Sequence, residues 1–169
     1  MAGAYIGMGS NLGDRAGTLR QAVSRLRTLG RITAISSLYE TEPVGYLEQP
    51  PFLNAVVASK TRLATIDLLR ALLAIERDLG RTRIFPNAPR TLDLDLLLVD
   101  AVVLNTDELI LPHPRLHERA FVLVPLAEIA PTARHPILAR SFSELLVALP
   151  DQKGVRVYAS RGWEALRSC

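Results

Sequence analysis

Two aspartates in a short leucine-rich segment have the types and spacing that most directly suggest chemistry in this chain. The segment 89–98 reads Pro-Arg-Thr-Leu-Asp-Leu-Asp-Leu-Leu-Leu. Its period-two alternation predicts a strand with Asp93 and Asp95 on one face and four leucines on the other. Those leucines are Leu92, Leu94, Leu96 and Leu98. At ~3.3 Å rise per residue, the two aspartate Cα atoms lie about 6.6 Å apart.

Two carboxylates at this spacing can bind divalent cations. Flexible side chains can close the gap to hold two ions, which lie ~3.5–4 Å apart in two-metal sites. Oxygen ligands favour Mg²⁺, which usually shares its coordination with a substrate phosphate. Arg90 stands at the start of the strand, where its planar guanidinium can bind that phosphate. The alternative is a half-exposed strand on which acids simply alternate with leucines, and this segment alone does not decide between the two.

An arginine-rich loop precedes the two aspartates. Arg81, Arg83 and Arg90 lie in or beside it. A charged loop is usually solvated surface, but here cations for phosphate oxygens and carboxylates for Mg²⁺ come together, as phosphoryl transfer requires. On the helix predicted before this loop, Glu76 falls in phase with core leucines, where a charge is costly unless it is paired. Glu76 therefore either faces a polar cleft, or lies solvated at an exposed helix end or pairs locally with an arginine.

Other candidate residues occur on both sides of this region. His113 lies between two prolines, which restrict the backbone around it, and Arg119 and Phe121 follow it. Phe52 and Asn54 are two residues apart on a predicted strand and so share a face. An aromatic ring and an amide on one face can stack on and hydrogen-bond a flat heterocycle. The more common arrangement for such a pair is an aromatic in the core beside a satisfied amide.

The composition predicts one ordinary globular domain. The chain has 169 residues, of which 49% are hydrophobic and 22% charged, with a formal net charge of +3. We expect no membrane span and no signal peptide. The only cysteine is Cys169, which excludes a disulfide within one chain and fits a cytoplasmic protein. The clustered arginines indicate a local anion site more than a polyanion-binding stripe, so we expect no binding to nucleic acid. We also expect a monomer that does not bind a membrane.

The order of predicted elements indicates the fold. Asp14 and Thr65 are the predicted N-caps of the two helices. Strands are expected near 3–8, 31–39, 52–59 and 92–99, and helices near 15–29 and 66–79. This βαββαβ order predicts a ferredoxin-like α+β fold, an antiparallel sheet with both helices on one face. Short helical pieces near 116–130 and 141–148 complete a domain of residues 1–149, and residues 150–169 form an extension of unknown role.

Taken together, these residues resemble the 6-hydroxymethyl-7,8-dihydropterin pyrophosphokinase family, whose members act in folate biosynthesis. The resemblance rests on short motifs that follow one another in order from about residue 4 to about residue 148. They are Gly9-Ser10-Asn11-Leu12, Tyr39-x-Thr41-x-Pro43-x-Gly45, Gln49-Pro50 with Phe52-Leu53-Asn54-Ala55, Glu76 with Gly80-Arg81-x-Arg83, Pro89-Arg90-Thr91-Leu92-Asp93-Leu94-Asp95, Pro112-His113 and Arg119-x-Phe121. The Pro-Arg-Thr-Leu-Asp-Leu-Asp segment is the most specific of them.

The resemblance implies a reaction and a role for each motif. The pterin hydroxymethyl oxygen attacks the β-phosphorus of ATP, and AMP leaves. Asp93 and Asp95 would bind two Mg²⁺ ions, and Arg81 and Arg90 would act with them in the chemical step. The residues implied for ATP binding are Glu76, Arg83, Arg90, Leu96, His113 and Arg119. The residues implied for pterin binding are Thr41, Glu42, Pro43, Val44, Phe52, Asn54 and Phe121.

Two other functions remain open from the sequence. A non-catalytic RNA-binding module can have the same fold, but its Arg/Lys-Gly-aromatic signature is missing here, and aromatic residues make up only 5% of the chain. A related enzyme could use ATP with a different acceptor hydroxyl. Phe121 and residues 41–54 favour a flat acceptor through the resemblance. The chain also departs from the family, since Asn87-Ala88 stand where many members have Trp-Gly.

Overall fold

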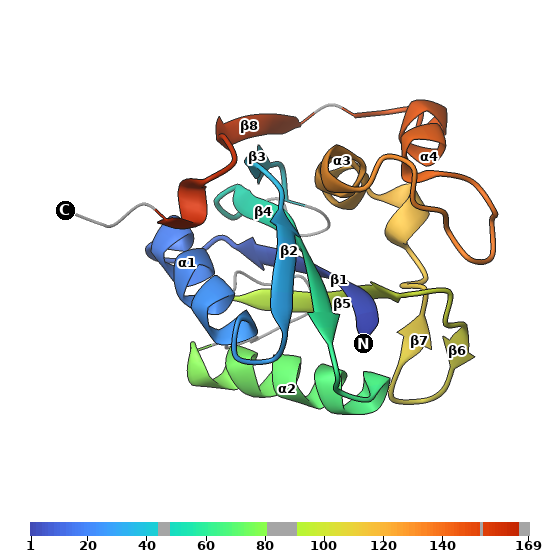
Figure 1. Ribbon diagram of the computed structural model, residues 1–169. Helices are drawn as coiled ribbons and strands as arrows, with labels where there is room; N and C mark the ends of the chain where they lie inside the picture. Colours follow the sequence, from blue (N-terminus) through green and yellow to red (C-terminus); the bar gives the residue numbers. More distant parts are fainter. Residues whose placement is uncertain (44–47, 81–90, 153, 166–169) are drawn as a thin grey trace.

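The computed structural model describes residues 1–43, 48–80, 91–152 and 154–165. Within these residues, eight strands and six helical segments follow one another (Figure 1). In order they are β1 (Ala2–Ser10), α1 (Arg15–Leu26), β2 (Arg31–Ile35), β3 (Leu38–Thr41), β4 (Phe52–Thr61), α2 (Thr65–Asp78), β5 (Asp93–Val99), β6 (Leu104–Asn105), β7 (Ile110–Leu111), η1 (Leu116–Glu118), α3 (Ala120–Ile129), α4 (Phe142–Ala148), β8 (Val155–Ala159) and η2 (Trp163–Ala165). In the described residues no helix is long and apolar enough to cross a membrane.

The main sheet confirms the predicted ferredoxin-like plan. Its strand order is β5-β1-β4-β3-β8. Strand β2 also pairs with β4, along a different part of β4 from the part that pairs with β3. The strand pairs described in this sheet are antiparallel. The single strand expected near 31–39 is therefore two strands. They are separated at Ser36, whose Oγ accepts a hydrogen bond from Val56 N on β4.

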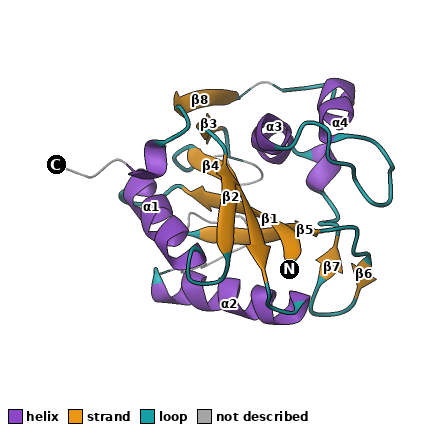
Figure 2. Ribbon diagram, viewed as in Figure 1, coloured by secondary structure: helices purple, strands orange, loops and turns teal. Residues whose placement is uncertain are grey.

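Helices cover both faces of the sheet, and each face has its own hydrophobic core. Helices α1 and α2 lie on one face, while α3 and α4 lie on the other (Figure 2). The first core includes Leu19 and Leu26 of α1 and Leu72 of α2. The second includes Leu123 of α3 and Phe142, which begins α4. The sheet is thus buried on both sides around the strands that carry the candidate site.

Capping explains how the two long helices begin and end. Asp14 accepts a hydrogen bond from Gly17 N at 3.1 Å, so the predicted N-cap of α1 is confirmed. Regular α1 ends at Leu26, earlier than expected, because the last turn tightens into i→i+3 bonds such as Leu29 N to Leu26 O. The prediction that Thr65 caps α2 was wrong. Thr65 is already the first helical residue, and the preceding Ala64 provides no side-chain cap.

A β-bulge in β5 changes which core its leucines enter. Leu92, Leu94 and Leu96 lie in the first core, as the alternation predicted. The register against β1 then shifts, because Tyr5 pairs with Leu98 and Ile6 with Leu96. The residue between them is the extra one of the bulge, and Leu98 therefore lies in the second core. The prediction that all four leucines share a face was wrong at Leu98.

Candidate active site

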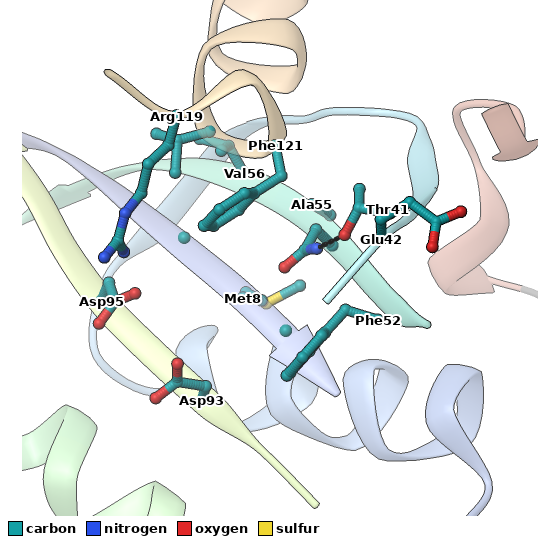
Figure 3. A pocket seen from close by; sticks show the side chains of 14 residues that line it. Met8, Thr41, Glu42, Phe52, Ala55, Val56, Asp93, Asp95, Arg119 and Phe121 are labelled. Carbon is teal, nitrogen blue, oxygen red and sulfur yellow. Dashed lines mark hydrogen bonds between the residues drawn. The ribbon is translucent and has the colours of Figure 1, made fainter. Parts of the chain in front are cut away.

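Fourteen residues line a pocket between the sheet and the start of α3 (Figure 3). They are Gly7, Met8, Gly9, Thr41, Glu42, Phe52, Asn54, Ala55, Val56, Asp93, Asp95, Arg119, Phe121 and Val122. We call this the acceptor pocket. It draws on β1, β3, β4 and β5 of the sheet and on the N-terminal end of α3. Gly7 and Asp95, which are 88 positions apart in the chain, meet here because β1 and β5 are neighbouring strands.

Two aromatic rings lie on different sides of the acceptor pocket. Figure 3 shows Phe121, from the start of α3, and Phe52, from the start of β4, with Met8 of β1 between them. The guanidinium of Arg119 lies 5.5 Å from the centroid of the Phe121 ring, within cation–π range. Two rings and an apolar floor suit a flat heterocycle, because stacking needs only ring faces.

Polar groups at one side of this pocket are organised by a buried hydrogen bond. Asn54 Nδ2 donates to Thr41 Oγ1 at 2.5 Å, a bond drawn dashed in Figure 3. Thr41 and Asn54 are both buried. Because the amide is held by the hydroxyl, its orientation is fixed before any ligand enters. Beside them Glu42 is exposed at the pocket rim.

The close packing of Asn54 and Phe52 against the adjacent strand β1 requires a glycine at position 9. A Cβ atom on Gly9 would lie 2.7 Å from Asn54 Oδ1 and 3.6 Å from Phe52 Cδ1. Strand β1 continues to Ser10, beyond the strand expected near 3–8, so Gly9 lies within the strand and lines the pocket. Sequence reasoning also missed Gly7 and Met8. The available signal was glycine inside a strand, which often marks a close approach.

Asp93 and Asp95 stand where the acceptor pocket meets a second pocket. They are paired with Gly9 and Gly7 of β1, and both side chains point to the same side of β5 (Figure 3). The predicted alternation is confirmed here. Both aspartates also line the second pocket, and Arg119 is the third residue common to the two. Any group passing between the pockets would therefore meet these three side chains.

The second pocket lies between α2, β5 and the β6–β7 hairpin. We call it the nucleotide pocket after the ligand that the sequence resemblance implies for Glu76, Leu96 and His113. Its lining is Leu69, Leu73, Glu76, Asp93, Leu94, Asp95, Leu96, Thr106, Asp107, Glu108, Leu109, Ile110, His113, Pro114 and Arg119. Glu76 and Leu96 are each 3% exposed. Glu76 therefore lies buried at a cleft and is not solvated at an exposed helix end. Glu108 binds Arg70 of α2 through both carboxylate oxygens, at 3.1 and 3.3 Å, joining two walls of this pocket.

The imidazole of His113 is held in a defined position in the nucleotide pocket. Its backbone N–H donates to Leu97 O at 2.8 Å, and its Nδ1 accepts from Arg115 N at 3.2 Å. Burial, followed by the charges of Arg119 and Arg115, lowers the pKa of His113, while Asp93 opposes the shift. A lowered pKa favours the neutral ring, which can donate a hydrogen bond from Nε2 while Nδ1 accepts one.

The two aspartates fit a hard cation that is completed by substrate oxygens. In the described part of the chain no group of three or more His, Cys, Asp or Glu side chains could hold a metal ion. Among the described residues, the candidate ligands are therefore the two carboxylates of Asp93 and Asp95, without a closed cage. That donor set is typical of Mg²⁺ bound through one or two carboxylates and substrate phosphates.

Some predicted site residues lie outside both pockets or outside the described residues. Arg81, Arg83, Arg90 and Val44 lie outside the described residues. Pro43 is buried but is not among the residues lining either pocket. The other predicted residues are gathered at the two pockets, with Thr41, Glu42, Phe52, Asn54 and Phe121 in the acceptor pocket and Glu76, Leu96 and His113 in the nucleotide pocket.

Comparisons with known proteins show the family of the chain. The family profile of 7,8-dihydro-6-hydroxymethylpterin-pyrophosphokinase (HPPK) matches residues 5–131. The 2-amino-4-hydroxy-6-hydroxymethyldihydropteridine pyrophosphokinase of Bacillus subtilis is 47% identical over 160 residues, covering 94% of this chain and 91% of the relative. The protein of that name from Pseudomonas aeruginosa is 44% identical over 148 residues, covering 86% and 91%.

Solved structures support the fold. The wild-type HPPK-DHPS of Plasmodium falciparum superposes with a TM-score of 0.69 at 15% identity. The match covers 87% of this chain and 44% of that longer protein. The superposition supports the ferredoxin-like fold, and the family profile together with the named relatives identifies a transferase of that fold. From the profile and its relatives, the chain belongs to the 6-hydroxymethyl-7,8-dihydropterin pyrophosphokinase family.

Proposed function

We propose that this chain transfers the pyrophosphoryl group of ATP to the hydroxymethyl oxygen of 6-hydroxymethyl-7,8-dihydropterin, a step of folate biosynthesis. The products are AMP and the pterin diphosphate. The observation that carries this proposal is the sharing of Asp93, Asp95 and Arg119 by two pockets, one suited to a flat acceptor and one to a nucleotide. Relatives at 44 and 47% identity are named for the same activity.

The acceptor is bound by stacking and by edge recognition. Phe52 and Phe121 hold the pterin ring between them, and Thr41 and Asn54 present polar atoms to its edge. Because the Asn54–Thr41 bond preorganises these atoms, little ordering cost remains when the pterin binds. The ring geometry then directs the hydroxymethyl group toward Asp93 and Asp95.

The donor is bound on the other side of the two aspartates. Leu96 contacts the adenine, Glu76 lies near the nucleotide, and His113 and Arg119 bind the triphosphate. Arg83 contributes to ATP binding, and Arg81 and Arg90 act in the chemical step, as the sequence motifs predict. Arg119 lines both pockets, so its charge lies where the transferred phosphoryl oxygens pass.

Asp93 and Asp95 are the residues that would hold two Mg²⁺ ions at the junction. When bound, Mg²⁺ neutralises phosphate charge and lowers the pKa of the attacking hydroxyl. The protein's own task is to place the acceptor oxygen in line with the β-phosphorus and to exclude water. Positioning of this kind accounts for a large part of catalysis in phosphoryl transfer.

A product assay tests the reaction directly. The protein is incubated with ATP, Mg²⁺ and 6-hydroxymethyl-7,8-dihydropterin, and AMP and ADP are both quantified. We expect AMP and pterin diphosphate in equal amounts, and no AMP when the pterin is omitted. ADP in place of AMP would mean ordinary γ-phosphoryl transfer. Neither product from folded protein would instead favour a different acceptor or a binding module.

A further inference from the structure

One arginine joins the two strands from which the polar side of the acceptor pocket is built. Arg15, the first residue of α1, donates from one Nη atom to Glu40 Oε2 at 3.1 Å and to Pro51 O at 2.9 Å. Thr41 and Phe52 form the last pair of the β3–β4 ladder. Glu40 directly precedes Thr41, and Pro51 directly precedes Phe52. Arg15 thus holds the two strands at the point where they reach the pocket.

Strand β8 contacts the end of β3 along the edge opposite to β4. Strand β8 pairs with β3, with Thr41 opposite Val155, and Gly154 O accepts a hydrogen bond from Glu42 N at 3.0 Å. Gly154 has a φ of +78°, and a Cβ atom there would lie 2.7 Å from Glu42 Cγ. A residue with a side chain would be strained at this position and would collide with the pocket rim.

The carboxylate of Glu40 binds one arginine from α1 and one from β8. Arg156 of β8 donates to Oε1 at 2.6 Å, while Arg15 of α1 binds Oε2. The Glu40 side chain is only 18% exposed, and that of Arg15 22%, so water screens this pair less than a surface pair. The hydrogen bonds from Arg156 and then Arg15 lower the pKa of Glu40. The guanidinium of Arg15 also lies 5.6 Å from the Tyr158 ring centroid.

The strand that carries Arg156 is itself anchored in the core. Trp163, which follows β8, is 1% exposed, and its Nε1 donates to Ser36 O at 2.8 Å. Its carbonyl accepts from Arg20 Nε on α1 at 3.1 Å. The described residues after 150, for which no role was predicted, therefore contact α1, the sheet and the pocket rim.

We propose that Arg15, with Glu40 and Arg156, positions the acceptor-binding residues Thr41 and Phe52. Arg15 is a positioning residue that touches neither substrate, and it acts through Glu40 and the Pro51 carbonyl. This inference rests on the proposed function. It predicts a selective effect, because the nucleotide pocket is lined by none of these residues. Loss of the arginine should raise the KM for the pterin and leave the KM for ATP and kcat nearly unchanged.

The test compares Arg15→Gln with a control on the same helix. We expect the pterin KM to rise about tenfold in Arg15→Gln, equivalent to about 1.4 kcal/mol of binding free energy. Arg15→Lys should recover part of it, since an ammonium group can still donate to Glu40. The matched control is Arg25→Gln, which removes an exposed pair to Asp78 outside both pockets. Its KM values should equal those of the wild type.

A second variant keeps the inference testable if Arg15→Gln does not fold. The Arg156 side chain is 62% exposed, so Arg156→Gln should fold, and we expect a smaller rise in the same KM. Equal pterin KM values in wild type, Arg156→Gln and folded Arg15→Gln would overturn the inference. A parallel rise in the ATP KM would also overturn it. If the wild type itself forms no AMP, the proposed function has failed instead.

Discussion

Gly9 and Asn54 approach so closely that the strand β1 has no room for a side chain between them. A Cβ atom at position 9 would lie 2.7 Å from Asn54 Oδ1, a distance that real Cβ atoms essentially never show. The same amide donates to Thr41 from its nitrogen. The shape of the acceptor pocket therefore depends on the absence of a methyl group on a neighbouring strand.

Gly9→Ala should weaken pterin binding while the protein remains folded. The added methyl group must displace the Asn54 side chain and disturb its bond to Thr41. We expect the pterin KM to rise about tenfold, or about 1.4 kcal/mol, with the ATP KM unchanged. The control on the same strand is Tyr5→Phe, which changes a residue that lines neither pocket and should leave both KM values unchanged. An unaltered pterin KM in Gly9→Ala would contradict this account of the pocket.

Asp95→Asn should remove turnover without unfolding the chain. The substitution keeps the size of the side chain but removes the charge that would hold Mg²⁺, so we expect kcat to fall at least about 100-fold, as for loss of other transition-state electrostatic groups. Circular dichroism should show an unchanged fold. Chelation of Mg²⁺ with EDTA should likewise stop the wild type. Asp78→Asn, at an exposed site, serves as the control, and comparable activity of Asp95→Asn would refute the assigned role.

The stability of the chain should rise with pH through the window just below 6.5, in part because of His135. Burial, followed by the nearby His117, lowers the pKa of His135 from 6.5. Its Nδ1 accepts hydrogen bonds from Ile137 N and Leu138 N, which requires an unprotonated Nδ1. The unfolded chain therefore binds a proton at a higher pH than the folded chain, and stability is lost as pH falls from the unfolded pKa toward the folded one.

Thermal unfolding between pH 5 and 8 measures this dependence. In His135→Gln the slope below pH 6.5 should become shallower. A residual slope is expected, because burial also lowers the pKa of His113. A slope identical to that of the wild type would show that His135 does not titrate differently in the two states.

Tyr39→Phe should destabilise the protein by about 1.5 kcal/mol, the range for hydrogen bonds to charged groups. The Tyr39 hydroxyl donates to Glu128 Oε1 at 2.9 Å, and burial together with this carboxylate raises the pKa of Tyr39 to about 12. Ser37 N and Oγ also donate to Glu128 and would remain. Urea denaturation measures the loss. Tyr158→Phe, at a 53% exposed tyrosine, should change stability by less than about 0.5 kcal/mol.

The sequence alone was sufficient to predict structural features that depend on a few neighbouring residues. Side chains alternate along any strand, so the placement of Asp93 and Asp95 on one side of β5 followed from their spacing. The N-cap at Asp14 followed from the short reach of its carboxylate to Gly17 N. The ferredoxin-like order followed from the succession of such local patterns, and the motifs were specific enough to indicate the family.

Tertiary structure alone decided how distant residues meet. The bulge that moves Leu98 to the second core depends on pairing with β1, and the function of Gly9 depends on the position of Asn54 on β4. The extension after residue 150 had no readable pattern, yet β8 completes the sheet beside Thr41. These relationships depend on strand order and packing between elements, whose energies involve residues far apart in the chain, so no local pattern encodes them.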